Sequence, residues 1–217
     1  MPSASPRLTS PRLRRLAQQR AASAGADQEQ CELCGEAVPR EHRHVLDVET
    51  RQLLCTCRRC AILFDSRAAG GGHYRLAPER RLRLDEFELS DLDWEQLQIP
   101  VDIAFFFDSS AAGRVQAFYP SPMGATESEL ELSTWRELES ANPVLATMQR
   151  DVEALLVDRA KGARRQWLVP IDDCYRLVAV IRTRWRGFTG GKDVWLELER
   201  FFDDLDRRSR SHPQERR

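Results

Sequence analysis

Cysteine thiols are the side chains of this chain whose spacing points most directly to chemistry. Five of the six cysteines fall between residues 31 and 60. Two pairs, Cys31 with Cys34 and Cys57 with Cys60, each have the spacing C-x2-C. Two thiolates separated by two residues can reach one ion from a tight turn, and two such pairs complete a tetrahedral four-sulfur site. The spacing therefore predicts a metal site formed by Cys31, Cys34, Cys57 and Cys60.

Zn²⁺ is the metal that we expect at this site, with iron as the alternative. A rubredoxin-like iron site uses four thiolates as well, but rubredoxins usually carry a glycine after both pairs. Here Gly35 follows the first pair and Ala61 follows the second. An iron–sulfur cluster fits less well, because the spacing matches no ferredoxin pattern. Cys55 is the fifth cysteine of the cluster, and it is either an alternative ligand in place of Cys57 or a free thiol near the metal.

Two histidines lie between the cysteine pairs. His42 and His44 are two residues apart, which places them on one face of a predicted strand. That position suits a metal ligand or a general base, and it equally suits an exposed hairpin face beside Arg43. Nucleases of the His-Asn-His type combine such a histidine with two cysteine pairs. They usually keep a further histidine after the last cysteine, where this chain has Ala61 and Ile62, so we expect no enzymatic activity and no catalytic residues.

The segments around the cysteines predict how the metal site is held. Gly35 fits a tight turn after the first pair, because glycine adopts the left-handed backbone that such a turn needs. Residues 42–48 and 51–55 predict a hairpin turned at Glu49 and Thr50. Residues 57–64 predict the start of a helix that carries the second cysteine pair. A turn, a hairpin and a helix arranged in this order resemble the treble-clef zinc finger.

Composition predicts a folded, cytoplasmic protein. The chain has 217 residues, of which 41% are hydrophobic and 31% charged, enough to bury a sizeable core. It has neither an apolar run of membrane-spanning length nor a signal-peptide pattern, so we expect no membrane insertion. Clustered cysteines in a reducing compartment favour a metal over disulfides. The net charge is −1 with arginine-rich ends and an acidic middle, so a nucleic-acid partner is not expected.

The pattern along the chain predicts five segments. A disordered basic tail (1–28) precedes the four-cysteine zinc module (29–66). A connector (67–99) with a short helix near 90–97 leads to a second domain (100–207). A second disordered basic tail (208–217) follows.

The second domain contains an internal repeat with an offset of 50 positions. Five identities recur within its first hairpin: Ala104/Ala154, Asp108/Asp158, Arg114/Arg164, Gln116/Gln166 and Pro120/Pro170. Each unit predicts two strands followed by a helix, the first helix opened near Thr126 and the second after Pro170. Two such β-β-α units predict a four-stranded antiparallel sheet with helices on one face. The fold class is therefore α+β, and any ligand of a cleft between the repeats is left open.

Several stretches carry a family resemblance, among them CELCG, LLCTCRRCAILFD, GGGHYRL and WLVPIDDCYRLVAVIRTRWRGFTGGKDVW. Residues 31–207 resemble an uncharacterised actinobacterial family whose members are often encoded beside nickel–iron uptake hydrogenases and their maturation genes. The resemblance implies a role in hydrogenase assembly or maturation, with a hydrogenase subunit or a maturation factor as the protein partner. It carries over no catalytic residues, because none are established for that family.

The function that we expect is therefore that of a non-enzymatic, zinc-binding accessory protein acting through protein–protein contacts. A rubredoxin-like iron electron carrier for the same system is one alternative, and a nucleic-acid-binding zinc protein is another. The sequence leaves the oligomeric state open.

Overall fold

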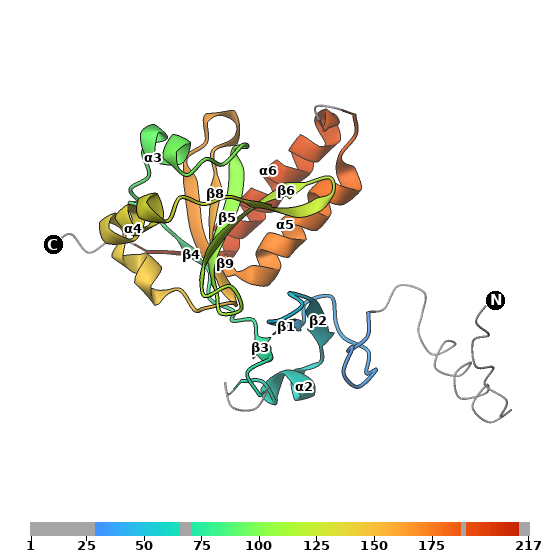
Figure 1. The fold of residues 1–217 in the computed structure, drawn as a ribbon. Helices are drawn as coiled ribbons and strands as arrows, with labels where there is room; N and C mark the ends of the chain where they lie inside the picture. The colour runs from blue at the N-terminus through green and yellow to red at the C-terminus, as the bar shows by residue number, and fades with distance from the viewer. Residues whose placement is uncertain (1–28, 66–70, 188–189, 213–217) are drawn as a thin grey trace, which may run out of the picture.

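The computed structural model describes residues 29–65, 71–187 and 190–212 (Figure 1). The predicted tail 1–28 and residues 213–217 of the second tail lie outside the described residues. Within the described part, the strands form two sheets, one small and one large. The α+β fold class is confirmed. In chain order, the elements are β1 (Arg43–Asp47), β2 (Leu53–Thr56), α2 (Arg58–Ile62), β3 (Tyr74–Leu76), β4 (Leu82–Arg83), α3 (Asp91–Gln96), β5 (Ile103–Ser109), β6 (Arg114–Ser121), β7 (Gly124–Ser128), α4 (Leu132–Ala141), η1 (Pro143–Thr147), β8 (Glu153–Asp158), η2 (Ala160–Gly162), β9 (Arg165–Pro170), α5 (Ile171–Arg184), α6 (Gly191–Arg208) and β10 (Arg210–Ser211).

The small sheet has the order β2-β1-β3, and its antiparallel β1–β2 hairpin is the one predicted between the cysteine pairs. The turn is closed by Asp47, whose Oδ1 accepts hydrogen bonds from the backbone N–H groups of Glu49 and Thr50, each at 3.0 Å. An Asp that accepts from the next residues in this way stabilises a turn locally. Helix α2 begins directly after β2, as the sequence predicts.

The large sheet has the order β10-β4-β9-β8-β5-β6-β7 and is antiparallel except for the β10–β4 pair. The two predicted hairpins, β5–β6 and β8–β9, form its centre and are joined through β5 and β8. The prediction of a four-stranded sheet was wrong, because the sheet has seven strands. Strands β4 and β10 have two residues each, which is too short to show an alternating pattern. Thr126 lies in β7 opposite Tyr119 and does not cap a helix.

The prediction of helices on one face was also wrong, because helices cover both faces of the large sheet. Strand β5 divides its side chains between the two faces, with Phe105 on one and Phe106 on the other. A strand whose side chains are apolar on both faces needs apolar cover on both sides. We call the two packed layers the α5–α6 core and the α3–α4 core. The α5–α6 core includes Phe105, Phe107, Leu156, Trp167, Leu177, Leu198 and Phe202, and the α3–α4 core includes Trp94, Phe106, Trp135, Leu138, Leu155 and Leu168.

The internal repeat stays a prediction. The helices that follow the two hairpins, α4 and α5, pack on opposite faces of the sheet. A twofold axis perpendicular to the sheet would keep both helices on one face. The strands are therefore arranged as a repeat requires, but the helices are not.

The small sheet is packed against the large unit. Leu46 in β1 and Val48 directly after it are buried in the α5–α6 core. Arg75 of β3 donates a hydrogen bond to the backbone oxygen of Arg150 at 2.6 Å. The predicted connector supplies β3 to the small sheet, and it supplies β4 and α3 to the large unit. Helix α3 lies within the short helix predicted near 90–97, and Ser90 caps it through a capping box.

The start of the predicted C-terminal tail contains regular structure. Strand β10 pairs with β4, and the backbone N–H of Arg210 donates to the oxygen of Arg81 at 2.9 Å. Among the helices in the described ranges, none has both the length and the apolar character needed to cross a membrane.

Candidate metal centre

The first cysteine pair sits in a tight turn that is held by backbone hydrogen bonds. The N–H of Gly35 donates to the oxygen of Cys31, and the N–H of Cys31 donates to the oxygen of Glu36, both at 2.7 Å. Gly35 has φ +76°, a left-handed conformation that side chains with a Cβ adopt only at a cost. The glycine therefore allows the chain to turn back immediately after Cys34.

The second cysteine pair sits at the start of α2. Cys57 is the N-cap residue of the helix, and Cys60 lies one turn later. The N–H of Ala61 donates to the oxygen of Cys57 at 2.9 Å, which closes this first turn. Helical geometry places residues i and i+3 on the same side of the helix, so both thiols face the turn that carries the first pair.

The four predicted cysteines come together. The Sγ atoms of Cys31, Cys34, Cys57 and Cys60 all lie within 4.8 Å of one another. The Sγ atoms of Cys34 and Cys57 are 3.7 Å apart. A tetrahedral zinc ion with Zn–S bonds of about 2.3 Å places its sulfurs about 3.8 Å apart. The arrangement can therefore hold a metal ion, and none of the four thiols is in a disulfide.

The cluster of buried residues around the four cysteines consists largely of sulfur. The buried residues packed together here are Cys31, Val38 and Cys57, with Cys60 partly buried beside them. Three apolar residues of this size cannot offset the conformational entropy of ordering the turn and the helix. A metal ion bonded to four thiolates supplies that missing free energy in small domains.

Backbone hydrogen bonds lower the pKa of one thiol of the group, that of Cys31. Burial opposes ionisation of Cys31, but hydrogen bonds from the backbone N–H groups of Cys57, Cys34 and Leu33 outweigh it, and its pKa is lowered to about 6. Cys60 is affected in the opposite sense. Its side-chain hydrogen bond with Cys34, burial and the neighbouring thiols raise its pKa to about 12. A divalent cation among the sulfurs would favour the thiolate form of all four.

Cys55 lies in a second group, with His42 and His44. One ring nitrogen of each histidine and the Sγ of Cys55 lie within 4.8 Å of one another. Cys55 is directly opposite His44 in the β1–β2 hairpin. The two imidazole rings are in contact, with their centroids 4.7 Å apart. The prediction that His42 and His44 share a face is therefore confirmed.

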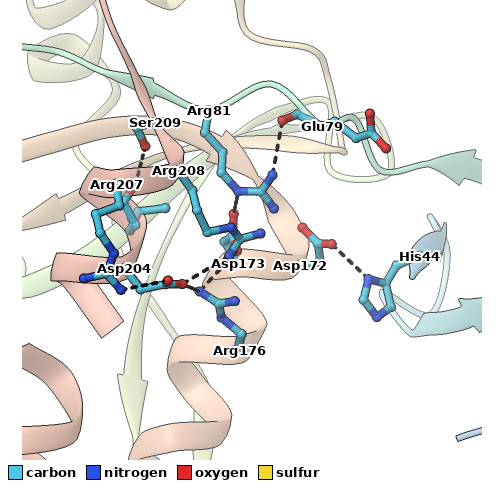
Figure 2. A network of polar contacts seen from close by, with 11 residues as sticks. His44, Glu79, Arg81, Asp172, Asp173, Arg176, Asp204, Arg207, Arg208 and Ser209 are labelled. Atoms are coloured by element: carbon cyan, nitrogen blue, oxygen red, sulfur yellow. Dashed lines mark hydrogen bonds and ion pairs between the residues drawn. The ribbon is translucent and has the colours of Figure 1, made fainter. Parts of the chain in front are cut away.

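Figure 2 shows that His44 reaches from β1 to Asp172 in the first turn of α5. The Nδ1 of His44 and the Oδ2 of Asp172 are 2.9 Å apart. The next residue, Asp173, is buried and bonded to Arg81, whose Nε donates to its Oδ2 at 2.5 Å. The start of α5 therefore carries two aspartates with different partners. The partner of Asp172 is His44 in the small sheet, and the partner of Asp173 is Arg81.

The histidine–aspartate contact has no signal in the sequence. His44 and Asp172 are separated by 128 positions, and an aspartate at the start of a helix is ordinarily a capping residue. The pairing of His44 with Cys55, by contrast, follows from the length of the hairpin. It could have been derived from the predicted turn at Glu49 and Thr50.

The repeat-related aspartates lie apart. In the β5–β8 pairing Asp158 is opposite Ile103, whereas Asp108 is at the other end of β5. Each has a local partner, because Asp108 accepts from Arg150 and Asp158 accepts from Arg165, both at 2.7 Å. These residues satisfy charges at the two ends of the sheet and do not face a common cleft.

Residues 30–209 match a protein family described as a family of unknown function, DUF5947. No curated protein and no solved structure matches the chain.

Proposed function

Because the chain belongs to the DUF5947 family, whose function is unknown, we propose its function from the four-cysteine group. The protein acts as a non-enzymatic accessory protein, in which Zn²⁺ held by Cys31, Cys34, Cys57 and Cys60 stabilises a docking module. The observation that carries the proposal is the approach of four thiols, from a turn and a helix, to within 4.8 Å of one another. Four thiolates fill the coordination shell of Zn²⁺ and leave no position open for a substrate.

Exposed apolar side chains on the same module support a docking role. Leu33, between the first two cysteines, is 42% exposed, and Ile62 and Leu63, after the last cysteine, are 66% and 62% exposed. The contact between the Sγ atoms of Cys34 and Cys57 brings the two segments together. Large apolar side chains exposed on one small module favour contact with a protein partner.

The partner that we propose first is a nickel–iron hydrogenase subunit or a hydrogenase maturation factor. This choice rests on the resemblance of residues 31–207 to proteins encoded beside such hydrogenases. The chemistry of the docking surface itself calls only for an apolar partner face.

Metal analysis tests the centre. We would measure the zinc and iron content and the absorption spectrum of protein purified without added metal. The expected result is bound zinc, no iron and no visible absorption. Iron with visible thiolate-to-metal bands would contradict the zinc assignment and favour the rubredoxin-like electron carrier. Protein that binds neither metal after reconstitution would contradict the centre itself.

A binding assay with purified hydrogenase components tests the docking surface. Ile62→Asp with Leu63→Asp is expected to abolish co-elution, because two charges would replace the apolar contact. Leu196→Asp is the matched control, since Leu196 is 52% exposed on α6 in the large unit. Equal binding by both variants would contradict this surface, and no binding by the wild type would contradict the proposed partner. Salt-dependent retention on DNA would instead favour the nucleic-acid alternative.

A further inference from the structure

We propose that His42, His44 and Cys55 form a second metal site, separate from the four-cysteine group, which binds a divalent ion of the zinc type through two imidazole nitrogens and one thiolate. The three donors are half-buried and come from the start and the two strands of one hairpin. Imidazole and thiolate together are a donor set that suits Zn²⁺ and related transition metals.

The hairpin fixes the positions of the donors. His44 and Cys55 are directly opposite in the β1–β2 register, and side chains at such paired positions point to the same face of the sheet. His42 precedes β1 by one residue and lies on the face of His44. The antiparallel pairing of β1 with β2, which extends to Leu46 and Leu53, therefore brings the donor atoms together. Their positions do not depend on a flexible loop.

His42 presents an unused nitrogen in a buried place. Its Nδ1 is 2.8 Å from the backbone oxygen of Pro39. Because a carbonyl oxygen only accepts, Nδ1 carries the proton, and in the neutral ring Nε2 has a free lone pair. The side chain is only 6% exposed, and Nε2 is buried without a hydrogen-bond partner in the part of the chain that the structure describes. A buried acceptor left unpaired is destabilising, and a metal ion at Nε2 would remove that cost.

His44 is oriented in the manner usual for a metal ligand. Its Nδ1 is 2.9 Å from Oδ2 of Asp172, and Figure 2 shows the carboxylate on one side of the ring and the second nitrogen directed away from it. Metal-bound histidines commonly donate their other N–H to a carboxylate or a backbone carbonyl. His44 has the carboxylate and His42 has the carbonyl, so both rings keep Nε2 for the metal.

The surrounding charges also favour a cation. Glu32 accepts a hydrogen bond from the backbone N–H of Cys55 at 2.6 Å. Glu29 lies 3.7 Å from Nδ1 of His42. Two carboxylates at the edge of the group would attract a divalent cation to the site.

Three protein ligands leave one coordination position free. Such open sites bind water or an exogenous ligand in the fourth position, whereas four-thiolate sites are closed. The two sites would therefore differ in how fast they exchange their metal ion. The His-His-Cys site would release its metal more readily than the four-cysteine site.

Cobalt titration of the full-length protein tests the second site, because Co²⁺ reports the number of bound thiolates in its absorption. We expect two Co²⁺ per chain in the wild type, one with the strong bands of four thiolates. His42→Gln and Cys55→Ser are each expected to lose the second equivalent and keep the first with unchanged bands. The matched control is His73→Gln, because His73 belongs to the same part of the chain but is 59% exposed and paired with Glu49. It should keep both equivalents.

Asp172→Asn tests the orienting role of the carboxylate. The amide can no longer accept from Nδ1 as a charged partner, and the affinity for the second ion should fall about 10–100-fold, with the first ion unaffected. Binding of a single ion by the wild type would overturn the proposal, as would retention of the second ion by the double variant His42→Gln, Cys55→Ser. Loss of the four-thiolate bands in Cys55→Ser would also overturn it, because Cys55 would then belong to the first site. Failure of the four-cysteine centre would instead remove the strong bands and leave the weaker ones.

Discussion

The buried cluster of the four-cysteine module and the two cores of the large unit differ in the side chains that they contain. The module packs three sulfur atoms around Val38. The large unit packs two layers of aromatic and aliphatic side chains against a seven-stranded sheet, with Phe106, Leu155 and Trp167 fully buried. Hydrophobic burial scales with the area removed from water, so the large unit has a stabilising interior of its own. The cluster around the cysteines has too little apolar area and needs bonds to a metal.

One chain can therefore depend on two kinds of stabilisation at once. The two regions still touch, through Leu46 and Val48 in the α5–α6 core and through the contact of His44 with Asp172. Metal removal should therefore affect the module first, and a core cavity should affect the large unit first.

Removal of the metal from the four-cysteine group is expected to have the largest effect. Cys57→Ser removes one of the four thiolates, and structural zinc contributes about 10–16 kcal/mol to the folding of small domains. Amide hydrogen exchange should become fast in the module while β5, β8 and β9 stay protected. Cys174→Ala is the counterpart, because Cys174 is fully buried in the α5–α6 core. It should lower the melting temperature and keep the metal. Unchanged metal content in Cys57→Ser would show that Cys57 is not a ligand.

A cavity in the large unit is expected to have the next largest effect. Phe106 is fully buried, and its ring lies 5.4 Å from that of Trp135 between centroids. Phe106→Ala should reduce the free energy of unfolding by about 3–5 kcal/mol. Urea unfolding followed by Trp fluorescence measures this change, and metal analysis of the same sample should give the wild-type content. Loss of metal in this variant would mean that the module cannot hold its ion without an intact large unit.

Replacing a glycine that has a left-handed backbone should have a smaller effect. Which property changes should depend on whether the glycine lies in the four-cysteine module or in the large unit. Gly35 has φ +76° and Gly113 has φ +65°, and a Cβ at either position would meet no atom within 4 Å. Each Gly→Ala change should therefore cost only the strain of the left-handed backbone, about 1–2 kcal/mol. Gly35→Ala should weaken metal affinity and leave the main melting transition in place. Gly113→Ala should lower that transition and leave the metal affinity in place. The reverse result would contradict the separation of the two regions.

Acid should remove a still smaller contribution from the surface of α6. Burial alone would raise the pKa of Asp204, but the guanidinium groups of Arg176 and Arg208 outweigh it, so the pKa is lowered. A carboxylate with a lowered pKa stabilises the fold above its unfolded value of about 3.9 and loses that contribution as the pH falls through the folded value. Because the side chain is 38% exposed, the contribution should stay below about 1 kcal/mol.

The measurement compares the melting temperatures of wild type and Asp204→Asn at pH 7 and pH 3. The difference should be present at pH 7 and should shrink at pH 3. Asp203→Asn is the control, since Asp203 is 66% exposed and lies 4.0 Å from Arg165. A difference that grows on acidification would contradict the assigned direction.

Local patterns in the sequence determined much of the four-cysteine module. The spacing of the two cysteine pairs, Gly35 and the turn residues Glu49 and Thr50 predicted a turn, a hairpin and a helix start. The structure contains all three. Such features depend on residues a few positions apart, whose geometry is set by backbone sterics and short-range hydrogen bonds. The apolar strands and the short helix near 90–97 were predictable for the same reason.

The tertiary structure alone decided which distant residues meet. The continuous apolar runs of β5 and β8 did not say which helices cover them, and the two-residue strands β4 and β10 exist only because neighbouring backbone offers hydrogen bonds. The contact between His44 and Asp172 joins residues 128 positions apart. Spacing in a sequence fixes geometry over one or two turns of chain, whereas long-range contacts depend on how the whole set of apolar faces closes. The cysteine pairs were therefore visible in the sequence, and the carboxylate that orients His44 was not.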